Sequence, residues 1–222
     1  MRHAIRQFAQ DMATATSLAG LASCQIRIKI SLRIRVKFLR SLWNPVKPGQ
    51  INELYQAAFA ELPIPGHRMH HMLAVLDCFS RYLLVLQVCH EPTAQAMAEG
   101  LKKALHEART ISQLEEDRLI SLVADCGPSI AASEIANCIY GMPFLLIPPT
   151  TRTFQSLGMV RRLIWTVKDE ETSLHSYRDP IEAQHSLERF RRTYNFERPH
   201  QALGYCVPAD LFCRKSGLRS IN

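Results

Sequence analysis

Apolar and polar residues alternate along residues 25–39. Isoleucine, leucine, valine and phenylalanine occupy every second position from 26 to 38, and Arg, Lys or Ser occupies the positions between. A period of two is typical of a β-strand with one apolar and one cationic face. This pattern predicts a strand that could pair with the edge of another sheet or lie along a polyanion.

From residue 48 onward the pattern predicts several strands followed by alternating helices and strands. Short apolar runs bounded by turn residues predict strands at 51–59, 70–77, 82–89, 119–124 and 144–147. Apolar residues at helical spacing predict helices at 92–108, 133–140, 157–168 and 178–193. Strands that alternate with helices in this order indicate an α/β domain.

Charge divides the chain into parts. Residues 1–47 hold nine Lys or Arg and one acid, which gives them a net charge of +8. The whole chain carries +7, so the remainder carries −1. We therefore expect a basic N-terminal arm over 1–47, weakly structured or β, a domain over 48–212 and a tail over 213–222. Such an arm suits a polyanion such as DNA, because each neutralised phosphate releases condensed counterions. A run of charge is also typical of an ordinary solvated surface.

Three motifs at separate places in the chain resemble those of one family. The residues from Tyr194 to Gly204, followed by Pro208, resemble the "YN-x-x-RPH-x-AL-G" ending of bacterial insertion-sequence transposases, relatives of the retroviral integrases. Residues 76–84 resemble the "D-x-FSR" hairpin of the same domains, and residues 122–127 resemble their "S-D-x-G" strand end. The resemblance implies a ribonuclease-H-like fold, a mixed five-stranded sheet flanked by helices. In the hairpin we expect Asp77 and Arg81 to be structural, fixing the turn through local hydrogen bonds and pairing with each other.

The resemblance also implies a chemistry. In this family two Asp and one Glu hold two Mg²⁺ or Mn²⁺ ions for DNA phosphoryl transfer, and such hard cations require oxygen ligands. Asp125 matches the second Asp. The third acid should open a helix of "G-x-V-E-R" type, but the chain has Arg161 there, with thirty-five residues between it and Asp125. Aligning residues 48–55 on the family's first strand puts Tyr55 at the first ligand position.

Two of the three catalytic acids are therefore expected to be absent. Glu53 is the possible substitute near Tyr55, since residues two apart share a strand face, and no acid replaces Arg161. We expect Asp125 alone to remain as a metal ligand, no competent site, and no bound cofactor.

The function that follows is that of a transposase or integrase catalytic domain in DNA integration and recombination, catalytically defective in this chain. The alternatives are a non-catalytic DNA-binding or interaction protein that reuses the fold, and a non-functional remnant of a mobile element. DNA is the expected partner, with a second copy or an intact transposase as further partners. The residues expected to contact nucleic acid are cationic: Arg27, Lys29, Arg33, Arg35, Lys37, Arg161, Arg162, Lys168, Arg198 and His200.

The cysteines and the hydropathy bear on location. Seven scattered cysteines without a C-x-x-C pair indicate reduced thiols. No apolar run reaches the length of about eighteen residues that a membrane helix needs. Residues 21–24 resemble a lipoprotein signal, but Asp11 and the hydroxyl residues of 14–17 interrupt its apolar segment. We expect a cytoplasmic protein without membrane contact.

Overall fold

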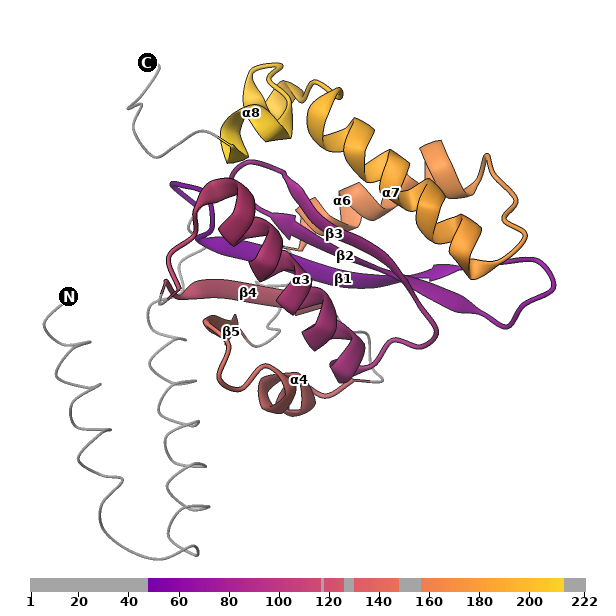
Figure 1. The fold of residues 1–222 in the computed structure, drawn as a ribbon, viewed down its shortest axis with the longest axis horizontal. Helices are drawn as coiled ribbons and strands as arrows, with labels where there is room; N and C mark the ends of the chain where they lie inside the picture. The colour runs from indigo at the N-terminus through magenta and orange to yellow at the C-terminus, as the bar shows by residue number, and fades with distance from the viewer. Residues whose placement is uncertain (1–47, 117, 126–129, 148–156, 214–222) are drawn as a thin grey trace, which may run out of the picture. The chain divides into compact units, whose positions relative to one another are not determined.

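The computed structural model describes residues 48–116, 118–125, 130–147 and 157–213. The arm, including the strand predicted over 25–39, lies outside the described residues, as does most of the C-terminal tail. Within the described part, five strands form a single sheet in the order β3-β2-β1-β4-β5 (Figure 1). The strands are β1 (Leu54–Leu62), β2 (His70–Asp77), β3 (Leu83–Cys89), β4 (Ile120–Asp125) and β5 (Phe144–Ile147).

The sheet is mixed, as the sequence predicts. Strand β1 pairs antiparallel with β2, and β2 pairs antiparallel with β3. On its other side β1 pairs in parallel with β4, and β4 in parallel with β5. The antiparallel half is a meander with short connections, whereas the parallel half needs crossovers through helices. The predicted fold class is therefore confirmed.

The first strand begins later than predicted. It spans Leu54–Leu62, not 51–59, because Asn52 has a left-handed φ of 60° that no strand accommodates. Both faces of β1 carry apolar residues, so the sequence shows no alternation from which the orientation of each side chain could be predicted.

The helices follow the predicted order with adjusted ends. They are α3 (Ala94–Ser112), α4 (Ala132–Cys138), α6 (Gly158–Val167), the π-helix η2 (Lys168–Thr172), α7 (Pro180–Phe196), the 3-10 helix η3 (Gln201–Leu203) and α8 (Pro208–Phe212). Thr93 caps α3, since its Oγ1 accepts from Ala96 N at 3.1 Å, and Asp179 caps α7 in the same manner. None of the helices among these residues has the length and apolarity needed to cross a membrane.

Helices cover both faces of the sheet. Tyr55 and Ala57 of β1 belong to a buried cluster with Met97 and Leu101 of α3, so α3 covers one face. Gln56, between them, points to the other face and contacts α6. The close approach of α3 to β2 requires a glycine, because a methyl group at Gly100 would collide with Leu73.

Helix α7 runs beside the edge strand β3 and satisfies its backbone (Figure 1). Asn195 donates from Nδ2 to Leu83 O at 3.0 Å and accepts from Leu83 N at 2.8 Å. Gln184 donates to Leu86 O at 3.2 Å and accepts from Val88 N at 2.7 Å. Two side-chain amides thus take the place of a neighbouring strand and cover an edge that would otherwise expose unpaired groups.

The terminal motif is mainly structural in this arrangement. Besides Asn195, it supplies Tyr194, which is buried and makes an edge contact with the ring of His200 at 4.8 Å between centroids. Gly204 and Tyr205 both have left-handed φ, 64° and 66°, and close the predicted turn. The fixed spacing of the motif therefore holds α7 to β3 and returns the chain towards α8.

Replacing Asn195 by Ala should destabilise the domain by about 2–3 kcal/mol, because buried backbone groups of Leu83 lose both partners. Urea denaturation measures this difference. The matched change Asn137→Ala, at an exposed position of α4, should shift stability by less than about 0.5 kcal/mol. Equal effects of the two changes would contradict the assignment.

Candidate functional site

The ends of β4 and α6 bring Asp125 and Arg161 together. Asp125 is the last residue of β4, and Arg161 lies in the first turns of α6. Arg161 donates to Asp125 Oδ2 from Nη2 at 2.7 Å and from Nε at 3.0 Å. The Asp125 side chain is 22% exposed and that of Arg161 45%, so the pair sits at the surface of the sheet's end. The resemblance assigns both residues to ligand positions of one site, and in the structure their side chains are in contact.

The register of β1 against β4 decides which β1 residue faces this pair. Ala58 is the Cα partner of Asp125, whereas Tyr55 is the partner of Leu122. Paired residues in adjacent strands share a face, so Asp125 and Ala58 point to the α6 side and Tyr55 to the α3 side. The prediction that Tyr55 occupies the ligand position beside Asp125 is therefore wrong. Its ring is fully buried, and its hydroxyl donates to Asn52 Oδ1 at 2.5 Å.

Glu53 cannot substitute for the missing first acid either. It lies before β1, about 16 Å along the strand from Ala58 at the usual rise per residue. Its carboxylate accepts from Gly49 N at 2.7 Å and from Gln50 Nε2 at 3.0 Å, which fixes the turn that leads into β1. Since Glu53 shares the parity of Tyr55, it also lies on the wrong side of the sheet.

Gln56 fixes helix α6 to the central strand. Its buried Oε1 accepts from Val160 N at 3.0 Å. This amide belongs to the first turn of α6, where no residue of the helix provides an acceptor and Leu157 supplies no side-chain cap. A side chain from β1 thus caps α6, and the cap holds the first turn, with Arg161, over the end of β4.

Asp77 and Arg81 hold the β2–β3 turn through hydrogen bonds, without an ion pair between their side chains. Asp77 Oδ2 accepts from Ser80 N at 2.8 Å and from Ser80 Oγ at 2.6 Å, and its Oδ1 accepts from Asn52 N at 2.9 Å. Burial raises the pKa of this carboxyl, and the hydrogen bonds counteract part of the rise. The turn-fixing role predicted for Asp77 agrees with these bonds. The predicted ion pair is wrong: among the described residues Asp77 forms none, and Arg81 contributes its backbone N–H to Asp77 O.

The residues predicted to contact nucleic acid differ in their exposure and in their partners. Arg161, Arg162 and Lys168 follow one another along α6 and η2, with Arg162 exposed. Arg198 is bound to Glu170 by two hydrogen bonds, one of them 2.8 Å long, so its charge is already compensated. The buried Nε2 of His200 has no hydrogen-bond partner among the described residues, and burial lowers the pKa of this imidazole. His200 is therefore not an exposed cation, contrary to the prediction. The five arm residues lie outside the described part.

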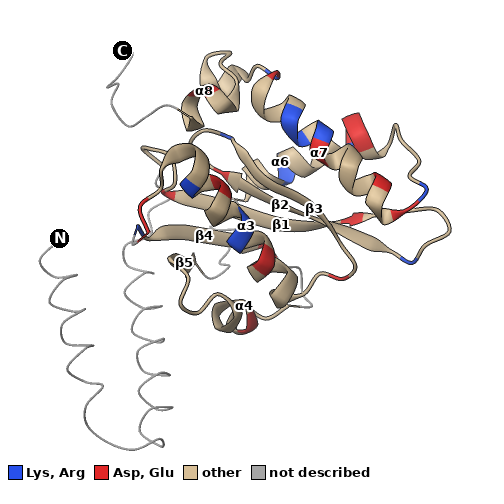
Figure 2. Ribbon diagram, in the orientation of Figure 1, with Lys and Arg blue, Asp and Glu red and all other residues tan. Residues whose placement is uncertain are grey.

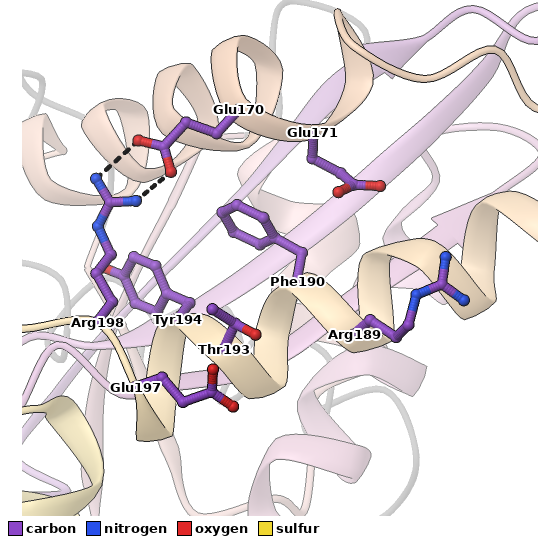
Figure 3. Close-up of a pocket in the computed structure, with 8 residues that line it drawn as sticks. All are labelled: Glu170, Glu171, Arg189, Phe190, Thr193, Tyr194, Glu197 and Arg198. Atoms are coloured by element: carbon purple, nitrogen blue, oxygen red, sulfur yellow. Dashed lines mark hydrogen bonds and ion pairs between the residues drawn. The ribbon is translucent and has the colours of Figure 1, made fainter.

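A separate groove of about 460 Å³ lies between η2 and α7 (Figure 3). It shares no lining residue with the Asp125–Arg161 pair. Figure 3 shows Phe190 pointing into it, with Arg198 and Glu170 joined at one end and Glu171 at the other. Sequence reasoning overlooked Glu171, which stands in an acidic run typical of an exposed surface. Its Oε1 accepts from Ser186 Oγ at 2.5 Å and from Tyr177 hydroxyl at 3.1 Å, so it is a buried structural carboxylate.

The strand order and the flanking helices define a ribonuclease-H-like domain, and comparison with known proteins supports this class. Residues 142–208 match the family model described as "Integrase core domain". This match covers 67 of the 222 residues, so that part of the chain resembles integrase core domains, and the fold agrees with the resemblance. No curated protein sequence matched the chain.

Solved structures of retroviral integrases share the fold. One is the simian T-cell lymphotropic virus intasome in complex with the PP2A regulatory subunit B56 gamma, at a TM-score of 0.59 and 14% identity over 80% of this chain. This chain spans 59% of the length of that one. Another is the HTLV-2 integrase catalytic core domain in complex with magnesium, in its trimeric form. It has a TM-score of 0.50 and 13% identity, over 74% of this chain and 98% of that one.

Replacing Gln56 by Leu should destabilise the domain by about 1–3 kcal/mol, because the buried Val160 N–H loses its acceptor. Hydrogen exchange should quicken in the first turn of α6 while α3 stays protected. Gln87→Leu is the matched control, a buried glutamine on β3 whose loss should leave the protection of Val160 relative to the rest of the domain unchanged. Unaltered exchange at Val160 in Gln56→Leu would contradict the capping role.

Proposed function

We propose that this domain is a non-catalytic transposase/integrase core, which binds DNA but does not catalyse metal-dependent phosphoryl transfer. One observation carries the proposal. The guanidinium of Arg161 donates two hydrogen bonds to the carboxylate of Asp125, at the position where the family has its third acid. The family match and the fold support DNA integration and recombination as the context.

The residues at this place do not fit a pair of divalent ions. Mg²⁺ and Mn²⁺ need several carboxylate oxygens, and two ions about 4 Å apart need several negative charges to offset their own. Asp125 supplies one carboxylate, its strand partner Ala58 supplies none, and Arg161 brings a positive charge. A fixed cation about 4 Å from a divalent ion repels it by about 8 kcal/mol at an effective dielectric of about 20. No group of three potential metal ligands forms among the described residues.

The same charges suit phosphate binding. A guanidinium presents a planar fork of donors to phosphate oxygens and stays protonated at all physiological pH values. Arg161 is half exposed, and Arg162 forms no ion pair within the described residues. Fixed cations can replace metal ions in holding a phosphate, although they cannot activate water. The basic arm over 1–47 would add sequence-independent contacts to the DNA backbone.

Ala58 is the position from which we infer that the first acid was lost, since its Cα lies opposite Asp125. The double change Ala58→Asp with Arg161→Glu should therefore create a site for Mn²⁺, measurable by titration calorimetry. The pair Tyr55→Asp with Arg161→Glu is the matched control and should gain no affinity, because Tyr55 faces α3. If neither variant binds Mn²⁺ better than the natural chain, the assignment of the lost acids is wrong. Mn²⁺-dependent nicking by the natural chain, abolished in Asp125→Asn, would overturn the loss of catalysis.

DNA binding should be indifferent to sequence, insensitive to EDTA and steeply weakened by salt. Arg162→Ala should lower the slope of log K against log salt by about one phosphate, and Arg161→Ala should lower it by less, because Asp125 already compensates the Arg161 charge. Deleting residues 1–40 should flatten the slope further. Arg178→Ala, an exposed arginine paired with Glu182, is the control and should leave the slope unchanged. If the full chain fails to retard duplex DNA at low salt, the binding proposal fails and the remnant of a mobile element is the better account.

A further inference from the structure

Helix α6 exposes a tryptophan. Trp165 is 68% exposed, whereas Val160, Leu163 and Val167 on the same helix are buried against the sheet. The indole cannot turn inward, because that face of the helix is already packed. Tryptophan is highly buried on average, and an exposed one is therefore more informative than an exposed leucine.

Cations surround this indole. Arg161 and Arg162 precede Trp165 by one turn, and Lys168 follows it by one turn. Figure 2 shows Lys or Arg, in blue, on α6. Arg162 and Lys168 form no ion pair in the part of the chain that the structure describes. Asp169 is the acid on the same face, so the surroundings stay net positive once Arg161 and Asp125 cancel. The combination of an aromatic face and uncompensated cations is the one that nucleic-acid grooves use.

The two most exposed aromatic side chains of the described residues lack this combination. Tyr140 is 87% exposed, but residues 135–147 contain no charged side chain. Tyr205 is 71% exposed, and the nearest arginine before it in the chain, Arg198, is bound to Glu170. Trp165 is thus distinguished from these two by its neighbours as well as by its exposure.

Helix α6 is also a rigid support. The Gln56 cap and the Arg161–Asp125 pair fix its first half to β1 and β4. A side chain on an anchored helix loses less freedom on binding than one on a loop. An indole held in this way can receive a flat ligand at low entropic cost.

We propose that Trp165 stacks on an unpaired nucleobase, and that Arg162 holds the adjoining phosphate. The inference rests on the proposed DNA binding and specifies its substrate class: single-stranded, frayed or overhanging DNA ends in preference to continuous duplex. In a duplex both faces of each base are covered by neighbours, so an indole has no face to stack on. A base without a partner offers that face, whatever its sequence.

The test uses the indole as its own probe. The chain has two tryptophans, Trp43 and Trp165, so a Trp43→Phe variant of the full chain reports on Trp165 alone. Its fluorescence should be quenched by a single-stranded oligonucleotide and by a duplex with a short overhang. It should be quenched much less by a duplex capped at both ends with polyethylene glycol linkers, which has neither free ends nor loop bases. Trp165→Ala should weaken binding to the overhang duplex about tenfold and leave binding to the capped duplex unchanged. Tyr140→Ala, another exposed aromatic, is the control and should change neither.

The outcomes separate this inference from the proposed function. Equal losses on overhang and capped duplex in Trp165→Ala, or binding without quenching, would overturn base stacking while leaving DNA binding intact. Loss of self-association in Trp165→Ala, seen by sedimentation with no change in DNA affinity, would make the surface a protein contact and overturn the inference. Failure of the natural chain to bind any of the three DNAs would overturn the proposed function as well.

Discussion

The parallel pairing of β1 with β4 is the constraint on which the site depends. It fixes Ala58 opposite Asp125 and places Gln56 one pleat away on the same face. From there Gln56 reaches the first turn of α6, and α6 in turn delivers Arg161 to Asp125. A shift of this register by one residue would exchange the two faces of β1, so that Gln56 would enter the α3 core and α6 would lose its cap. The geometry of the site therefore originates in backbone pairing rather than in contacts among its own side chains.

The electrostatics of the site differ from those of a metal centre in a way that favours folding. Clustered carboxylates repel one another until cations neutralise them, which makes a metal site a liability for stability when the ions are absent. Here one carboxylate meets one guanidinium, and an alanine stands beside them. This pair is neutral by itself and needs no external ligand to offset its charge.

Much of the fold could be predicted from the sequence, but the site could be predicted only in part. Turn residues and apolar runs located the β2–β3 hairpin and β5 closely, and the resemblance to transposases paired Asp125 with Arg161. The phase of β1 was not accessible, because both its faces are buried and no alternation marks them. Tyr55 was predicted from the alignment of residues 48–55 on the family's motif, and the register of β1 against β4 disagrees with that alignment. Gln56 was overlooked because a buried glutamine within an apolar strand shows its partner only after the strand and α6 are placed together.

The way α7 covers β3 has a consequence for how copies of this domain can assemble. Asn195 and Gln184 already engage the outward backbone of β3, so another strand could join there only by displacing the helix. Growth of the sheet is thereby confined to the β5 side, and β5 is a short strand preceded by Pro143, which has no N–H to offer. Addition of a strand from another copy is thus discouraged at the β3 edge. Contacts between copies would therefore use the helical faces. Such contacts depend on side chains, so single substitutions can strengthen or weaken them.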